Sequence, residues 1–214
     1  MKKLFLAIIG ILFIASCNVL WDVDTTDHVS MVSCKPDIKL LGDPMISFPV
    51  GSTYTEEGVE AFACDTPLTY TIVSGQVNPK EAGLYQVVYK ATNGFGWSSY
   101  AYRTVLVYNG DPYITDIGGD YRIGFLYHST ITKHSVKGFW QMSQAIDDPN
   151  KDYPVVLVED PNNVGHFIVV PGVWEDLGRY KGSAEYIPSP THPQLKLTIT
   201  FIDQALTKTY TWKK

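Results

Sequence analysis

The chain of 214 residues is short of charged side chains, and no basic cluster occurs anywhere in it. Asp, Glu, Lys and Arg make up 18% of the residues, and the formal net charge is −5. Without residues 1–16, which contain Lys2 and Lys3, 15 basic residues would face 22 acidic ones, a net charge of −7. Nucleic-acid binding and adhesion to anionic lipid both rely on clustered Lys and Arg. We therefore expect no nucleic-acid partner, and membrane attachment only through covalent lipid.

Motifs of the common enzyme classes are also missing. The sequence has no Gly-x-Ser-x-Gly, no Walker loop, no His-Glu-x-x-His and no Gly-x-Gly-x-x-Gly after a strand. The histidines are scattered without ligand spacing: His28, His128, His134, His166 and His192. The acidic pairs Asp147-Asp148 and Glu175-Asp176 have the carboxylates that glycoside hydrolysis needs, but adjacent acids in loops are usually just solvated. We expect a protein that is not an enzyme, with no catalytic residue, no cofactor and no metal site.

A long hydrophobic run is absent, but a short one opens the chain. Leu4–Ala15 is an uncharged apolar run of 12 residues after Lys2 and Lys3, too short for a hydrocarbon core of about 30 Å. Its length suits the apolar region of an export signal. The run ends Ile14-Ala15-Ser16-Cys17, which resembles a bacterial lipobox with Ile in place of the commoner Leu. The resemblance implies a signal peptide over residues 1–16 and a lipid on Cys17; the alternative is an ordinary secretory signal with an incidental cysteine.

Residues 17–34 read as a flexible tether, since they carry several acids and few apolar residues. Asp22, Asp24 and Asp27 resemble the acidic signal that follows the lipid cysteine in surface lipoproteins of gut Bacteroidetes, although they start later than is usual. This resemblance implies an outer-membrane lipoprotein that faces the cell exterior.

Frequent Tyr, Gly and Pro favour strands and turns, and no stretch keeps a helical period beyond a turn or two. Residues 35–109 alternate between short apolar segments and turn residues every 8–12 positions, as in an antiparallel sandwich. The clearest predicted strand is Gly83–Lys90, in which Tyr85, Val87 and Tyr89 share one face.

Three strings identify this region with a known family: Ile38–Pro44, Val50–Val59 and Gly83–Asn93. They resemble the bacterial Ig-like domain first noted in insecticidal crystal proteins, in which the module is a spacer or a binding module. Family members usually have Asp where Asn93 stands. Since a carboxylate is missing there, we do not expect a calcium site.

Cys34 precedes the first predicted strand, and Cys64 closes the segment Val59–Ala63. If these strands are antiparallel neighbours, the two cysteines lie close together. Export would place them in an oxidising compartment, where a disulfide persists. The alternative is a pair of buried free thiols.

A turn-rich break, Asn109-Gly110-Asp111-Pro112, starts the C-terminal domain, residues 110–214. We expect a small antiparallel barrel or sandwich, with Asp160–Gly165 as a hairpin turn. The predicted strands are Tyr121–Ser129, Val136–Gln144, Pro154–Glu159, His166–Val170, Ser183–Ile187, Leu195–Ile202 and Lys208–Trp212. An Ig-like domain before a strand-rich domain, behind a lipid anchor, resembles the arrangement of Bacteroidetes surface lipoproteins.

The most suggestive aromatic residues are Trp174 and Trp140. Trp174 follows Pro171-Gly172 in a predicted loop, with Glu175 and Asp176 beside it; a ring next to carboxylates suits a sugar. Phe139 and Trp140 point to opposite faces of a predicted strand, so one of them is exposed to solvent unless both faces are covered. Both tryptophans could instead be core anchors. We expect a lipid-anchored, non-catalytic binding protein that captures extracellular glycan; the alternative is a structural or protein-docking module of an envelope complex.

Overall fold

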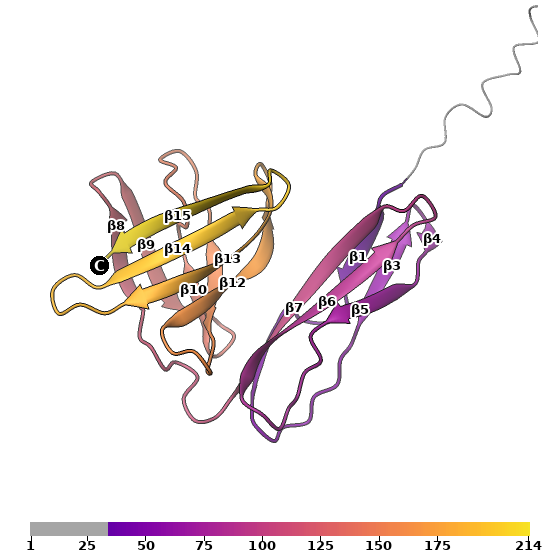
Figure 1. Ribbon diagram of the computed structural model, residues 1–214, viewed down its shortest axis with the longest axis horizontal. Coiled ribbons are helices and arrows are strands. Elements are labelled where there is room, and N and C mark those ends of the chain that lie inside the picture. Colours follow the sequence, from indigo (N-terminus) through magenta and orange to yellow (C-terminus); the bar gives the residue numbers. More distant parts are fainter. Residues whose placement is uncertain (1–33) are drawn as a thin grey trace, which may run out of the picture. The chain divides into compact units, whose positions relative to one another are not determined.

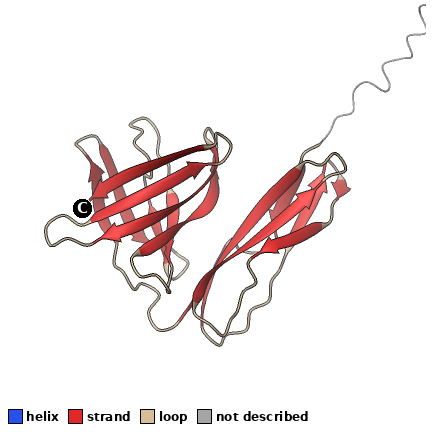
Figure 2. Cartoon of the chain, viewed as in Figure 1, coloured by secondary structure: helices blue, strands red, loops and turns tan. Residues whose placement is uncertain are grey.

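The computed structural model describes residues 34–214, which form strands, turns and loops without any helix (Figures 1 and 2). Within this range no helix has the length and apolar character needed to span a membrane. The prediction of an all-β protein is confirmed. Cys17 and the predicted signal peptide lie outside the described residues.

The first part of the chain folds into two packed sheets. One has the order β1-β3-β4 and the other the order β2-β7-β6-β5. The strands are β1 (Pro36–Leu40), β2 (Met45–Pro49), β3 (Val59–Ala63), β4 (Thr66–Pro67), β5 (Tyr70–Ser74), β6 (Gly83–Thr92) and β7 (Ser98–Tyr108). All neighbours are antiparallel except β2 and β7, which run parallel. The predicted strand Gly83–Lys90 lies within β6.

The core of this sandwich contains one buried ion pair among apolar side chains. Val59, Val87 and Tyr89 form the apolar cluster. Arg103 of β7 is fully buried and pairs with the carboxylate of Glu56, while its guanidinium also donates to the carbonyl of Leu41. The ion pair therefore ties the segment before β3 to the central strand of the larger sheet.

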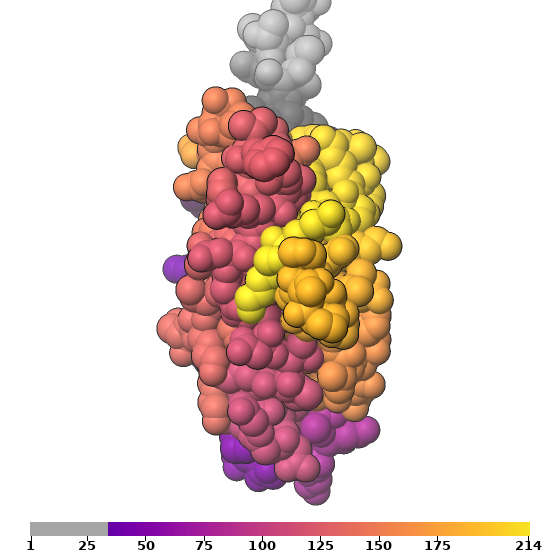
Figure 3. Space-filling view, turned by 90° about the vertical axis from the view of Figure 1, so that its left-hand side faces the viewer, coloured from indigo at the N-terminus to yellow at the C-terminus, as the bar shows by residue number. Residues whose placement is uncertain are grey.

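The second part of the chain closes into an eight-stranded antiparallel barrel with the cyclic order β10-β11-β12-β13-β14-β15-β8-β9. The strands are β8 (Gly119–Ile123), β9 (Tyr127–Lys133), β10 (Phe139–Met142), β11 (Val155–Glu159), β12 (His166–Trp174), β13 (Gly178–Ile187), β14 (Gln194–Phe201) and β15 (Leu206–Lys213). Lys213 of β15 pairs with Arg122 of β8, which closes the barrel. Figure 3 shows the C-terminal strands (yellow) against the first segments of the barrel (pink).

Side chains fill the barrel, so its interior is a core. Along β14, Leu195, Leu197, Ile199 and Phe201 alternate inward and are buried, as the period-two pattern predicts. They join a cluster that includes Trp212 and other large residues from around the barrel. An eight-stranded barrel is just wide enough for side chains to fill it, and here the cluster of buried side chains occupies the interior.

Several predicted strand boundaries are wrong. The predicted strand Tyr121–Ser129 is a hairpin, because Gly124 has a positive φ of 59° and reverses the chain between β8 and β9. The predicted strand His166–Val170 runs on to Trp174, since an irregularity between Val169 and Gly172 absorbs Pro171 without ending the pairing with β13. Asp160–Gly165 does connect β11 to β12.

Phe139 and Trp140 are buried on opposite faces of β10, because both faces of this strand are covered. Trp140 belongs to the cluster inside the barrel. Phe139 packs outside it with Val158 of β11 and Leu106 of β7. Residues 35–214 thus form one compact unit that includes both the sandwich and the barrel.

Candidate functional site

Trp174 is not the exposed platform that the sequence predicted. It is the last residue of β12 and only 7% exposed. Its ring stacks on Tyr180, meets Tyr153 edge-on at a centroid distance of 5.2 Å, and its Nε1–H donates to the carbonyl of Pro154 at 3.1 Å. Strand alternation turns the side chain into the barrel, where apolar burial and this hydrogen bond hold it. The prediction of a ligand-binding ring at Trp174 is therefore corrected to a core residue.

Trp140 is corrected in the same way, since it is 2% exposed. Tyr113 packs edge-on against its ring at a centroid distance of 5.1 Å. No stacking face of this residue is open to a sugar.

The acids after Trp174 are exposed, but they have no open ring beside them. Asp176 accepts a hydrogen bond from the Tyr153 hydroxyl at 2.7 Å and pairs with Lys151 at 3.1 Å. The hydrogen bond from Tyr153 is the largest influence that lowers the pKa of Asp176. Glu175 is exposed at the turn that joins β12 to β13. Trp174, Glu175 and Asp176 therefore do not form the expected sugar site, because the ring is buried while the two acids are exposed.

Cys34 and Cys64 are both disulfide-bonded in the structure. The chain has three cysteines, so two bonded ones within a single chain must be bonded to each other. The antiparallel register of β1 and β3 pairs Pro36 with Ala63, which brings the start of β1 to the end of β3. The disulfide fixes the edge where the described chain begins.

Two exposed aromatic residues that the sequence pattern did not single out, Phe95 and Trp97, lie at the turn between β6 and β7. Asn93 is buried, and its Oδ1 accepts hydrogen bonds from the backbone amides of Phe95 and Trp97, each at 3.0 Å. The backbone N–H of Asn93 donates to the backbone carbonyl of Trp97 at 3.0 Å. An Asn side chain that accepts from the following amides is a recurrent way to build a tight turn. The turn leaves Trp97 48% exposed and Phe95 53% exposed.

Trp97 lines a concave site together with Tyr100, which is 40% exposed. The cleft has a volume of about 520 Å³, within the usual range of roughly 300–1,000 Å³ for small-molecule sites. Its other residues are mainly polar: Lys35, Pro36, Asp37, Ile38, Ser98, Ser99, Arg179 and Asp203. The site thus places two accessible rings beside hydrogen-bonding groups.

The charges of this cleft differ in how firmly they are held. Arg179 donates through Nε and Nη2 to Oδ1 of Asp203, at 2.9 Å and 2.5 Å. These hydrogen bonds lower the pKa of Asp203 and raise that of Arg179. The Nζ of Lys35 lies 5.1 Å from the centroid of the Trp97 ring, and no ion pair within residues 34–214 involves Lys35 or Asp37. Lys35 is nevertheless close enough for its charge to help lower the pKa of Asp203.

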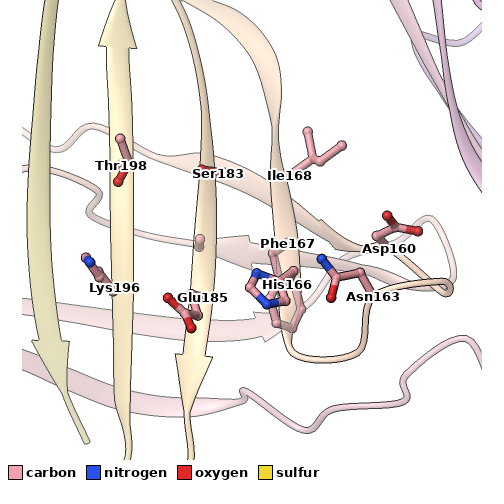
Figure 4. A pocket seen from close by; sticks show the side chains of 10 residues that line it. Asp160, Asn163, His166, Phe167, Ile168, Ser183, Glu185, Lys196 and Thr198 are labelled. Carbon is pink, nitrogen blue, oxygen red and sulfur yellow. The ribbon is translucent and has the colours of Figure 1, made fainter.

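A second concave surface lies on the outside of β12, β13 and β14 (Figure 4). In the close-up, His166 and Asn163 lie next to each other, and Glu185 and Lys196 extend from neighbouring strands. This groove of about 340 Å³ has no accessible aromatic ring, because the ring of Phe167 is buried with the barrel core; Ile168 is its half-buried apolar side chain. It lacks the stacking surface of the Trp97 cleft.

No group of three or more His, Cys, Asp or Glu in the described part of the chain has an arrangement suited to a metal ion. Asn93, which stands where the resembling family usually has Asp, acts as the acceptor that shapes the turn.

Residues 38–107 match the family model described as bacterial surface protein, Ig-like domain. This part of the chain is an Ig-like domain similar to those of bacterial surface proteins. The match spans β1 to nearly the end of β7, so Trp97 and Tyr100 belong to the Ig-like domain. The family's description suggests a cell-surface location.

The solved structure of the lipoprotein BT2262 from Bacteroides thetaiotaomicron is similar to this chain at 17% identity. The alignment has a TM-score of 0.35 and covers 84% of this chain and 100% of that one. No curated protein matches the sequence.

Proposed function

We propose that this chain is a lipid-anchored, non-catalytic protein of the outer membrane that faces the cell exterior and captures extracellular glycan. The observation that carries the proposal is the pair of exposed rings, Trp97 and Tyr100, on the wall of a polar cleft. A sugar presents an apolar C–H face and a rim of hydroxyls, and it needs both kinds of partner at once.

The cleft supplies partners for both parts of a sugar. The exposed ring surface of Trp97 packs against the C–H face. The Asp37 carboxylate accepts from hydroxyls, and the Lys35 ammonium, which lies over the Trp97 ring, donates to hydroxyl oxygens. The Asn93 turn holds Trp97 in place before the ligand arrives, which reduces the entropy lost on binding.

Glycan capture also agrees with the arrangement of the rest of the chain. We place the site in the Trp97 cleft, because the barrel interior is packed and the groove on the outside of the barrel has no exposed ring. The two rings of this cleft come from the Ig-like domain, and Arg179 and Asp203 of the barrel also line it. A lipid on Cys17 would keep the cleft at the cell surface, where polysaccharide is met.

A glycan array probed with the mature protein tests this proposal. We expect binding to one class of oligosaccharide, and Trp97→Ala should weaken that binding at least about tenfold, as expected when a central aromatic anchor is truncated. Phe95→Ala is the matched control, because Phe95 is equally exposed in the same turn but does not line the cleft. An array without a positive signal, or equal losses in both variants, would count against glycan capture.

A further inference from the structure

The edge of the larger sheet in the Ig-like domain is open at β5. This strand is last in the order β2-β7-β6-β5, and Figure 1 shows it beside β6. All of Tyr70–Ser74 is exposed, and the strand contains neither a charged residue nor a proline. Natural edge strands use charges, proline or bulges to prevent another strand from pairing with them. Of these, β5 has only the irregularity in its pairing with β6, between Ile72 and Ser74.

An apolar groove adjoins this edge. Ile72 of β5 lines it together with Val77 and Val87, and the ring of Tyr54 completes the wall; the volume is about 460 Å³. Gly75 allows the backbone after β5 to approach the backbone of β6 closely, since a Cβ at this position would lie 1.9 Å from the carbonyl oxygen of Gln86. The groove is therefore part of the fold and is open beside the free strand edge.

The two features together define the chemistry of an occupant. A free strand edge offers alternating backbone N–H and C=O groups, and only an extended polypeptide carries the complementary row. Every second side chain of such a segment would point toward the groove. The carboxylate of Glu56 in the groove is already neutralised by Arg103, which favours an uncharged, apolar side chain at that position.

We infer that β5 is a docking edge that takes an extended, uncharged apolar segment of a partner protein as an additional strand. A second copy of this chain fits less well. The pairing of β5 with β6 is irregular between Ile72 and Ser74, and in a symmetric pair of edges two such irregularities would face each other. The inference is independent of glycan binding, and it gives the docking alternative a location in the molecule.

The test uses a phage-displayed library of random heptapeptides, panned on the full mature protein. We expect selected peptides to share apolar residues at alternate positions and to slow amide hydrogen exchange at residues 70–74. Methylating one alternate set of backbone nitrogens in a selected peptide should abolish binding, while methylating the other set should leave it intact. That asymmetry identifies strand pairing, because a strand directs alternate amides to opposite sides.

Ile72→Lys should weaken the selected peptide at least about tenfold, because it places a charge at the mouth of the groove. Val173→Lys is the control, since Val173 is an exposed apolar strand residue of the barrel. Thermal unfolding of both variants excludes a loss of fold. Peptides without a shared pattern, exchange protection elsewhere, or equal effects of the two variants would overturn the inference. So would a dimer in light scattering that Ile72→Lys converts to a monomer, since a second copy would then occupy the edge.

Discussion

The ring of Trp174 stacks on the ring of Tyr180, with centroids 4.0 Å apart and an interplanar angle of 24°. The contact joins the end of β12 to β13 at one end of the barrel. It makes the residue a structural anchor, and the stability of the barrel should depend on it.

Trp174→Ala should lower the free energy of unfolding by roughly 3–5 kcal/mol, the range for truncating a buried aromatic side chain. Urea denaturation followed by circular dichroism measures this loss. Val173→Ala, one residue earlier and exposed, should change stability by no more than about 0.5 kcal/mol. Glycan binding should survive Trp174→Ala under conditions in which the variant is folded. A stable variant that has lost glycan binding would restore Trp174 as the ligand site.

The disulfide between Cys34 and Cys64 should stabilise the Ig-like domain. It closes a loop of about 30 residues, for which the chain-entropy model gives roughly 3–4 kcal/mol. Cys34→Ser and Cys64→Ser should lower the melting temperature by similar amounts, because either removes the same bond. Mass spectrometry of the untreated exported protein should find the linked peptide. Two thiols that react with an alkylating agent in the native protein would contradict the disulfide.

The buried pair of Arg103 and Glu56 predicts a strong effect of removing one partner. Glu56→Gln leaves the fully buried guanidinium of Arg103 without its carboxylate and should cost about 3–5 kcal/mol. Adding Arg103→Met should recover much of that loss, since the charge without a partner is then gone. Chemical denaturation of the two variants measures both values, and no recovery in the double variant would argue that packing outweighs the ion pair.

The same pair predicts how stability changes in acid. Burial alone would raise the pKa of Glu56, but the hydrogen bond from Tyr54 and the charge of Arg103 are among the interactions that bring it below its ordinary value. A carboxyl whose pKa is lower in the folded protein stabilises that state above its unfolded pKa, near 4.3, and this contribution disappears as the pH falls through the folded pKa. Melting temperatures between pH 6 and pH 2 should fall less in the double variant Glu56→Gln, Arg103→Met than in the wild type. Parallel curves would contradict the assignment.

Attachment to the membrane should depend on the thiol of Cys17. Cys17→Ala removes the nucleophile that receives the lipid, so cells fed radiolabelled fatty acid should yield unlabelled protein. A labelled variant would show that Cys17 is not the lipidated residue.

The local pattern of apolar residues predicted the architecture well and predicted the site poorly. Runs such as Gly83–Lys90 and Leu195–Ile202 determine strands by their own alternation. Gly83–Lys90 lies within β6, and Leu195–Ile202 lies in β14 except for its last residue. The closure of the barrel could not be predicted from the sequence, because Lys213 and Arg122 are far apart in the chain and no local pattern specifies their pairing.

The wrong prediction of a ligand site at Trp174 also has a physical reason. Pro171 and Gly172 favour a loop by composition, but the irregularity in β12 lets the strand pass them, so Trp174 is carried into the core. The sequence around Trp97, by contrast, contains a recognisable pattern for an exposed turn. An Asn-Gly pair followed closely by two aromatic residues, after the clearly alternating run Gly83–Lys90, indicates a hairpin turn that exposes large rings.

Fluorescence quenching of Trp97 tests glycan capture most directly. Trp140, Trp174 and Trp212 are buried, so acrylamide reaches mainly Trp97 in residues 34–214, and a Trp21→Phe background removes the remaining tryptophan. If the Trp97 cleft captures glycan, a saturating amount of the oligosaccharide found on the array should protect Trp97 and lower the quenching constant severalfold, toward that of Trp97→Phe. An unchanged quenching constant in protein that has demonstrably bound the glycan would show that the sugar binds elsewhere.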